Sequence, residues 1–376
     1  MSNKLAIVIG AGIVGLATAL ALSKKGYKVQ IFERHPQALG ASIRNFGMIW
    51  PIGQAAGKMY DRAMRSKAIW KQVCDEAGIW YDEVGSLHLA YHDDELQVMA
   101  EYVDLNQNTR SCKLLTPTQT LQKSEAVNPL GLKGALWSAD EMIVEARTAI
   151  NQLATYLEQH YKVEFFWNTA ISNVVFPEVH TGKNKYIADE IFICSGADFE
   201  TLFPEIFLNT PITKCKLQML RINAQEQNWR IGPSLCGGLS MIHYLGFQDA
   251  PSLKKLKDRY QTQLAEYLKW GIHVMVSQNE EGQLTIGDSH EYGLSHDPFD
   301  KQFINDMIID YLKTFSQFKD ETVIQTWNGI YPKMTNGQTE LVISPQKGVT
   351  IINALGGAGM TLSFGLAEEI VANLGN

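Results

Sequence analysis

Residues 5–33 read LAIVIGAGIVGLATALALSKKGYKVQIFE, and this stretch decides the fold. It joins an apolar strand, a glycine-rich turn, an apolar helix and a second strand that ends at Glu33. Gly10 suits the tight turn, Gly12 lets the backbone approach a pyrophosphate, and Gly15 lets the helix pack closely on the strand. The helix N-terminus offers amide donors to phosphates, and Glu33 can accept hydrogen bonds from ribose hydroxyls. The stretch therefore predicts a dinucleotide-binding βαβ unit.

The apolar run at residues 5–22 could also be taken for a short membrane span or a secretion signal. The glycine spacing, the lack of a small-residue cleavage site and the direct continuation into the strand YKVQIFER favour a buried strand, turn and helix. Five scattered cysteines without CxxC spacing are typical of reduced thiols rather than of a disulfide or zinc framework. We therefore expect a cytoplasmic protein with no membrane span and no metal site.

The composition is that of a globular chain. Its 376 residues, 45% of them hydrophobic, can bury a sizeable core and point to two domains. The formal charge of −7, from 33 basic and 40 acidic residues, comes without any block of like charges. Nucleic acid and anionic membranes are therefore not expected as partners, and any anion-binding site must be local.

A second glycine-rich loop, GGAGMT at residues 356–361, precedes an amphipathic helix near the end of the sequence. Such a loop can direct backbone amides and a helix dipole at an anion. In a reduced flavin the negative charge gathers at N1 and the C2 carbonyl, so this helix end would stabilise it. The chain has a single GxGxxG fingerprint, which argues against NAD(P) and FAD on two such folds, and Glu33 would repel the 2′-phosphate of NADP.

Four segments resemble, in order and separation, the FAD-contact segments of the D-amino-acid oxidase superfamily. They are GAGIVG at 10–15, ASIRNFGMIWP at 41–51, ICSGADFETLFP at 193–204 and GGAGMTLSFGLAE at 356–368. The resemblance is greatest to the branch of glycine oxidase, sarcosine oxidase and D-amino-acid dehydrogenase. A bacterial subgroup linked with aminophosphonate catabolism is most similar in ASIRNFGMIWP and in TIGDSHEYG at 285–293. The resemblance implies one non-covalent FAD as the cofactor.

The fold class that follows is α/β, or α+β overall: a Rossmann-like FAD-binding domain with an interleaved antiparallel-sheet substrate domain. The alternation of strands and helices breaks off twice along the chain and then returns, which indicates interleaving. We expect the FAD-binding domain to comprise residues 1–83, 140–210 and 323–376. The substrate-binding domain would then comprise residues 84–139 and 211–322.

The resemblance also implies FAD contacts, residue by residue. Gly10, Gly12, Ile13 and Gly15 would serve the pyrophosphate, Glu33 the ribose and Arg34 the adenine. The further contacts implied along the ribityl chain, the adenine, the pyrophosphate and the flavin ring are Ser42, Arg44, Asn45, Phe46, Gly47, Ile171, Ser195, Gly196, Gly357, Gly359, Met360 and Thr361.

The chain departs from the family pattern at the substrate. Where glycine oxidase-like proteins carry an arginine that pairs with the substrate carboxylate, WNGIYPKMTNG has Tyr331, and Thr361 stands where the sarcosine oxidase branch has a lysine. Arg44 is our first choice for the substrate anion, since a guanidinium can grip a carboxylate or a phosphonate at two points. His290, His243 with its neighbour Tyr244, and Tyr331 are the other candidates for catalytic or substrate-binding roles.

We expect oxidation of a small primary or secondary amine by hydride transfer to flavin N5, giving an imine that hydrolyses to an aldehyde or keto acid. Oxygen or another acceptor would take the electrons. A hydroxy-acid dehydrogenase on the same scaffold is the alternative. An aromatic-ring hydroxylase is disfavoured because no proline- and glycine-rich turn follows GDSH at 287–290. The acidic charge balance argues against a flavin domain that serves an RNA-modifying enzyme.

Overall fold

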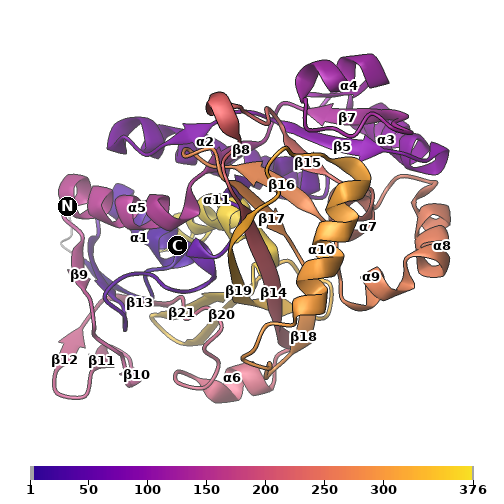
Figure 1. Ribbon diagram of the computed structural model, residues 1–376. Coiled ribbons are helices and arrows are strands. Elements are labelled where there is room, and N and C mark those ends of the chain that lie inside the picture. Colours follow the sequence, from indigo (N-terminus) through magenta and orange to yellow (C-terminus); the bar gives the residue numbers. More distant parts are fainter. Residues whose placement is uncertain (1–3, 375–376) are drawn as a thin grey trace.

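The computed structural model describes residues 4–374, and its first sheet holds the predicted βαβ unit (Figure 1). β1 lies between β2 and β13, parallel to both, and β20 closes one edge as the antiparallel strand. In the order of the sheet its strands are β20 (Leu341–Gln346), β21 (Val349–Asn353), β13 (Glu190–Ile193), β1 (Leu5–Ile9), β2 (Lys28–Phe32) and β9 (Glu164–Phe166). β1 is almost wholly buried, as a parallel strand covered on both faces must be.

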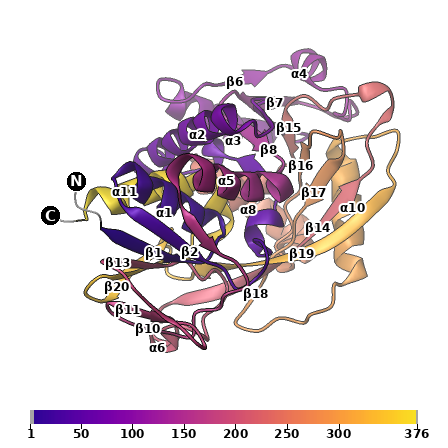
Figure 2. The same cartoon turned by 90° about the vertical axis from the view of Figure 1, so that its left-hand side faces the viewer.

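A layer of helices covers one face of this sheet (Figure 2). α1 contacts both α11 and α5, and α2 contacts α11. These helices are α1 (Ile13–Lys24), α2 (Lys58–Ala77), α5 (Ala146–Tyr161) and α11 (Gly359–Ala372). Val174 and Val179 of a small antiparallel sheet join the apolar core with Ile7 and Ile191, so that sheet covers the other face. Its strands are β10 (Asn173–Val175), β11 (Glu178–His180) and β12 (Lys185–Ile187).

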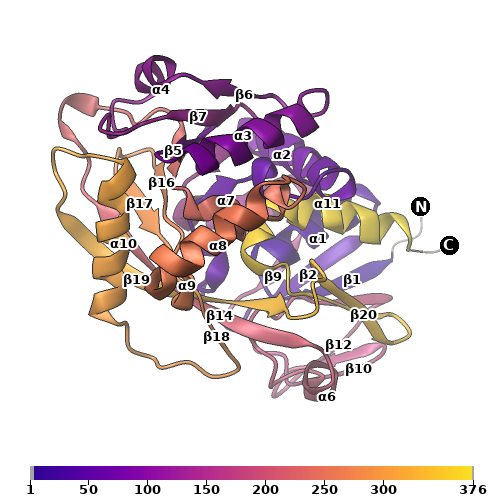
Figure 3. The ribbon, with the colours of Figure 1, turned by 90° about the vertical axis from the view of Figure 1, so that its right-hand side faces the viewer.

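The second large sheet has nine strands and is mainly antiparallel. Its longest pair is β14 with β19, which align from Ile212 to Ile222. The strands are β5 (Ser86–Ala90), β6 (Cys112–Leu115), β7 (Gly134–Ser138), β14 (Ile212–Ile222), β15 (Ser234–Cys236), β16 (Met275–Gln278), β17 (Leu284–Gly287), β18 (Glu291–Gly293) and β19 (Val323–Met334). A separate core joins this sheet to helices beside it (Figure 3). The helices of this part are α3 (Asp93–Asn106), α4 (Pro117–Lys123), α7 (Leu239–His243), α8 (Leu253–Gln263), α9 (Ala265–Lys269) and α10 (Gln302–Phe315).

Short elements connect the two parts. A three-stranded sheet forms from β3 (Met48–Ile49), β8 (Met142–Val144) and β4 (Tyr81–Asp82). The remaining short helices are α6 (Pro204–Leu208) and the 3-10 turns η1 (Ala41–Ile43), η2 (Pro51–Gly53), η3 (Glu226–Asn228), η4 (Leu245–Phe247) and η5 (Gly356–Ala358). The predicted fold class, a mixed α/β protein with a Rossmann-like unit, is confirmed.

The division into domains remains our proposal, with one change. Residues 323–334, which the sequence analysis assigned to the FAD-binding domain, form β19 and pair along β14 in the nine-stranded sheet. We therefore propose that the substrate domain extends to about residue 334. The sequence signal was weak because β19 changes from exposed to alternately buried residues along its length, without a single clear period.

The apolar run at 5–22 supplies β1, the glycine turn and most of α1, all within the first sheet and its helical layer. Within residues 4–374, no helix combines the length and the apolar character that crossing a membrane would require.

Candidate active site

A cavity of about 740 Å³ runs from the N-terminus of α1 to the nine-stranded sheet. All four residues proposed for substrate, Arg44, His243, His290 and Tyr331, line it. The predicted cofactor residues that line it are Gly10, Gly12, Ile13, Glu33, Arg34, Ser42, Arg44, Asn45, Phe46, Ile171, Ser195, Gly196, Gly357, Gly359, Met360 and Thr361. Gly15 and Gly47 do not line the cavity, so any role they have is through the backbone that they shape.

The glycine turn leaves no room for side chains. A Cβ on Gly15 would lie 1.9 Å from the Gly10 carbonyl oxygen, and a Cβ on Gly10 would lie 2.4 Å from the Cys194 carbonyl oxygen. Gly10 also has a φ of +106°, which favours glycine. Gly12 is the N-cap residue of α1 and has no side chain to cap the helix. The positive end of α1 therefore faces the cavity, where it can bind an anion.

Glu33 is the first residue after β2 and lies beside this turn. One carboxylate oxygen accepts a hydrogen bond from the Ala11 amide at 3.0 Å and the other from the His35 amide at 3.1 Å. Arg34 forms an ion pair with Asp198, whose pKa is lowered, against the opposing effect of burial, by hydrogen bonds from Thr201 and by Arg34. These contacts hold both side chains at one end of the cavity, away from the histidines on the nine-stranded sheet.

The segment ASIRNFG folds into a tight turn against α1. The Ile13 amide donates to the Ser42 hydroxyl at 2.9 Å, and the Asn45 amide group donates to the Ala41 and Ser42 carbonyl oxygens at 3.0 and 2.9 Å. Asn45 Oδ1 also accepts from the Gly47 amide at 2.8 Å. Asn45 thus shapes the turn as well as lining the cavity, a role that the sequence did not predict.

The start of α11, after the C-terminal glycine loop, is tied to the segment between β3 and η2 and to α2. The Trp50 amide donates to the Thr361 hydroxyl at 2.9 Å, and the Trp70 indole donates to the Met360 carbonyl oxygen at 2.8 Å. These buried bonds fix the start of α11 at the cavity wall. The positive end of α11 therefore lies at the cavity wall, where it can stabilise negative charge.

Tyr331 and Lys333 stand two residues apart on β19 and both line the cavity, since alternate residues of a strand share a face. Tyr331 is buried, and its burial raises the pKa of the phenol well above the usual value. The phenol is therefore a neutral hydrogen-bond donor. Lys333 donates to the Tyr292 hydroxyl at 3.3 Å and lies 5.2 Å from the centre of that ring.

Arg44 lies at the C-terminus of η1, with its side chain largely exposed at the cavity rim. Its guanidinium donates to the Asn328 carbonyl oxygen at 3.3 Å, and the Trp327 indole donates to the Arg44 carbonyl oxygen at 3.3 Å. Only one guanidinium nitrogen is engaged in this contact, which leaves other donors for an anion.

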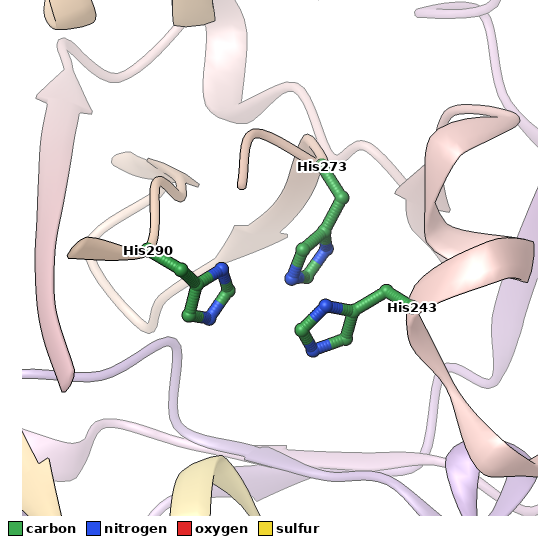
Figure 4. A group of neighbouring side chains, drawn as sticks. All are labelled: His243, His273 and His290. Carbon is green, nitrogen blue, oxygen red and sulfur yellow. The ribbon is translucent and has the colours of Figure 1, made fainter. Parts of the chain in front are cut away.

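His243 and His290 lie beside a third histidine, His273, that the sequence analysis did not select (Figure 4). The ring centres of His243 and His273 are 3.8 Å apart, and those of His243 and His290 are 4.8 Å apart. The three come from the end of α7, the segment before β16 and the segment after β17. No spacing in the sequence joins them, because only the packing of α7 on the sheet brings them together.

Burial keeps these imidazoles neutral. It lowers the pKa of His243 and His273 well below the usual value, helped by the charges of neighbouring histidines and of Lys333. It lowers the pKa of His290 to about 4. Asp288 lies among them, with Oδ1 3.2 Å from His273 Nε2, and burial raises the pKa of its carboxyl well above the usual value.

Three residues of this end, His273, Asp288 and Lys333, were missed from the sequence. Asp288 and Lys333 stand inside segments that the sequence analysis quoted, TIGDSHEYG and WNGIYPKM. Lys333 could have been found from the two-residue period of a strand, counted from Tyr331. His273 carries no such signal, since it stands alone in WGIHVMV.

Comparisons with known proteins agree with this architecture. A family model described as "DAO: FAD dependent oxidoreductase" matches residues 6–373. The chain is 21% identical over 350 residues to a component of the opine oxidase of Rhizobium meliloti, across 88% of this chain and 82% of that protein. L-proline dehydrogenase from P. horikoshii superposes with a TM-score of 0.79 and 19% identity, covering 99% of this chain and 93% of that chain. Glycine oxidase from Bacillus cereus superposes with a TM-score of 0.76 and 16% identity, covering 98% and 94%.

Proposed function

We propose that this chain, which belongs to the DAO family of FAD-dependent oxidoreductases, oxidises a small primary or secondary amine that also carries an anionic group. The family match confirms the resemblance seen in the four segments, and FAD is the cofactor. An amino acid or an aminophosphonate would be the substrate. The observation that carries the proposal is a cavity lined by the cations Lys333 and Arg44 and by the neutral groups of Tyr331 and His290.

The cavity residues fit FAD. Gly12 caps α1 without a side chain, so the helix N-terminus is open to a pyrophosphate, and Glu33 lines the same end for a ribose. At the other end the start of α11 offers its positive dipole to a flavin ring. We propose non-covalent binding, since no cysteine occurs in the β19 segment WNGIYPKM.

Bound FAD supplies an acceptor for the two electrons of the C–H bond beside the substrate nitrogen. The chain's residues bind and orient the amine. Lys333 and Arg44 are placed to pair with the substrate anion, and the Tyr331 hydroxyl can donate to it as a neutral group. Two cations suit a carboxylate and suit a phosphonate better, since it carries more negative charge.

His290 is placed to hold the amine nitrogen. Its Nδ1 lies 2.9 Å from the Gly271 carbonyl oxygen, which can only accept, so Nδ1 carries the proton and Nε2 keeps its lone pair. Nε2 can thus accept a hydrogen bond from the amine and orient it. Oxidation gives an imine, which water hydrolyses to an aldehyde or keto acid, and oxygen or another acceptor takes the electrons from the cofactor.

The test uses the yellow holoprotein without oxygen. We expect the flavin absorbance to bleach with amino acids or aminophosphonates and to persist with hydroxy acids of the same carbon skeleton, which serve as matched controls. A cationic site predicts faster bleaching by an amine with an anionic group than by the same amine without one. Bleaching by hydroxy acids alone would contradict the amine proposal and favour a hydroxy-acid dehydrogenase.

We propose a cytoplasmic location and a small molecule as the reaction partner. All five cysteines are free thiols in the structure, as expected of a reducing compartment. The net charge of −7 gives no excess of basic residues for binding nucleic acid.

A further inference from the structure

We propose, in place of the absence of a metal site expected from the sequence, that His243, His273 and His290 bind a divalent transition-metal cation of the Zn²⁺ class, with Asp288 as a neighbouring carboxyl group. Each histidine offers one ring nitrogen, and the three nitrogens lie within 4.8 Å of one another (Figure 4). Imidazole nitrogens and carboxylate oxygens are ligands that Zn²⁺ takes in tetrahedral protein sites. The inference concerns cation binding: His290 Nε2 then binds the cation in place of the amine, whichever amine the flavin oxidises.

The cluster holds buried polar atoms without partners. His273 Nδ1 has no hydrogen-bond partner among the described residues, and His273 Nε2 and Asp288 Oδ1, although 3.2 Å apart, form no hydrogen bond of acceptable geometry with each other or with any other described residue. His273 is 3% exposed and Asp288 is 6% exposed. Buried polar atoms are normally hydrogen-bonded or bound to a metal, because removing them from water without a partner is unfavourable. A cation between the rings would satisfy these atoms together.

The ring nitrogen of His290 that points away from the cluster supports the same assignment. His290 directs Nδ1 at the Gly271 carbonyl oxygen, 2.9 Å away, and so presents Nε2 to the cluster. Metal-binding histidines nearly always donate their other N–H to a carbonyl or carboxylate, which fixes the ring and its tautomer. Gly271 is suited to this approach, since a Cβ there would lie 2.7 Å from the His290 Cβ.

Binding requires a small closure of the cluster. Ligand nitrogens around tetrahedral Zn²⁺ lie about 3.3 Å apart, given Zn–N bonds of about 2.0–2.1 Å. The present spread of up to 4.8 Å can close by rotation of His243, the least buried of the three, on the short helix α7. Its ring now stacks on that of His273, with ring centres 3.8 Å apart and an interplanar angle of 29°, so the ring must also turn out of this stack to direct a nitrogen at a shared cation.

The charges around the cluster set its specificity. Lys333 lies near the cluster and repels a bound cation, whereas Asp288 offers a carboxyl oxygen to it. All three histidines line the cavity. Only His243 and His290 were predicted to do so from the sequence. A cation held by three imidazoles keeps one coordination position for the cavity, where a carboxylate, phosphonate or amine can bind.

The experiment titrates chelator-treated holoprotein with Zn²⁺ and with Co²⁺. We expect one equivalent to bind, with Co²⁺ giving ligand-field bands at wavelengths beyond the flavin absorption. His243→Asn and His273→Asn should each weaken binding at least tenfold. Two variants are used because His273 is fully enclosed and its replacement can disturb folding, whereas His243 is partly exposed. His88→Asn, a buried histidine outside the cluster, is the matched control and should bind as the unaltered protein does.

Lys333→Met distinguishes a cation site from an anion site. Removing this positive charge should tighten Zn²⁺ binding if the cluster holds a cation, and weaken binding of inorganic phosphate if the cluster holds an anion. The proposal is overturned if no stoichiometric metal binds, if His243→Asn binds Zn²⁺ unchanged, or if Lys333→Met leaves Zn²⁺ binding unchanged. Bleaching of the flavin by an amine tests the proposed function separately, so the two can fail independently.

Discussion

The two ends of the cavity are built in different ways. The end at α1 relies on backbone: Gly10, Gly12 and Gly15 bring amides and a helix N-terminus to the surface with no side chain in between. The end at the nine-stranded sheet relies on side chains from separate segments, among them His243 and Tyr331. A binding surface made of backbone must be encoded by neighbouring residues, whereas one made of side chains can be gathered from anywhere in the fold.

The largest expected effect is at the backbone end. Gly15→Val should abolish FAD binding and folding, because even a Cβ would lie 1.9 Å from the Gly10 carbonyl oxygen and α1 cannot move away without leaving β1. We expect a loss of more than about 4 kcal/mol in the free energy of unfolding. The yield of yellow protein and its thermal midpoint measure it. Gly182→Ala, with no atom near its Cβ, is the control; normal flavin content in Gly15→Val would refute the close-packing argument.

The second prediction concerns Glu141, a buried carboxyl group outside the cavity lining. Glu141 accepts hydrogen bonds from the Ile52 amide at 3.0 Å and from the Ser86 hydroxyl at 2.9 Å, joining the η2 turn to β5. Burial raises the pKa of its carboxyl to about 7. Because the folded state then binds a proton more tightly than the unfolded chain, stability from this group is present below about pH 4.5 and is lost as the pH rises to about 7.

Glu141→Gln should remove that pH dependence, because the amide oxygen can still accept from Ile52 and the amide nitrogen can donate to the Ser86 hydroxyl. As the pH rises from about 4.5 to about 8, the unfolding free energy of the unaltered protein should fall by about 3 kcal/mol relative to that of the variant. Denaturant unfolding at several pH values measures the difference. Glu158→Gln, an exposed carboxyl on α5, is the control. If the unfolding free energies of Glu141→Gln and of the unaltered protein change with pH in the same way, the pKa of Glu141 is not raised by folding and the prediction is wrong.

The third prediction tests whether Lys333 and Arg44 bind the substrate anion. Lys333→Met and Arg44→Ala should each lower kcat/KM about 30-fold, which corresponds to the loss of about 2 kcal/mol from a charge-assisted pair to an anion. Lys347→Met, an exposed lysine away from the cavity, is the control. If kcat/KM falls in only one variant, the substrate anion pairs with the side chain removed in that variant. If neither variant changes kcat/KM, the substrate anion is not held by this wall.

The smallest effect is expected at the C-terminal loop. Thr361→Val keeps the shape of the side chain but removes the acceptor of the buried Trp50 amide. The free energy of unfolding should fall by about 1–2 kcal/mol, the cost of an unsatisfied buried amide. Thermal unfolding measures the change against Thr262→Val, an exposed threonine on α8. An equal shift of the thermal midpoint in both variants would mean that the hydrogen bond to Thr361 adds no measurable stability.

The sequence by itself determined the backbone end. The glycine spacing at 10–15 and the acidic residue Glu33 were enough to predict a Rossmann-like unit, because turn geometry and helix ends are set by residues next to one another in the chain. FAD was implied by the resemblance of four segments, the loop at 356–361 among them, to the D-amino-acid oxidase superfamily. Asn45 was identified from a resemblance, but its hydrogen bonds to the ASIRNFG turn were visible only in the structure.

The tertiary structure alone decided the side-chain end. It placed β19 in the nine-stranded sheet, which puts Tyr331 and Lys333 on one wall, and it packed α7 so that His243 meets His273 and His290. No local pattern specifies these meetings, because they follow from how strands and helices of distant segments pack around a shared core. Local sequence therefore determines what the cofactor end must be, and the packing of the fold determines which side chains face the substrate.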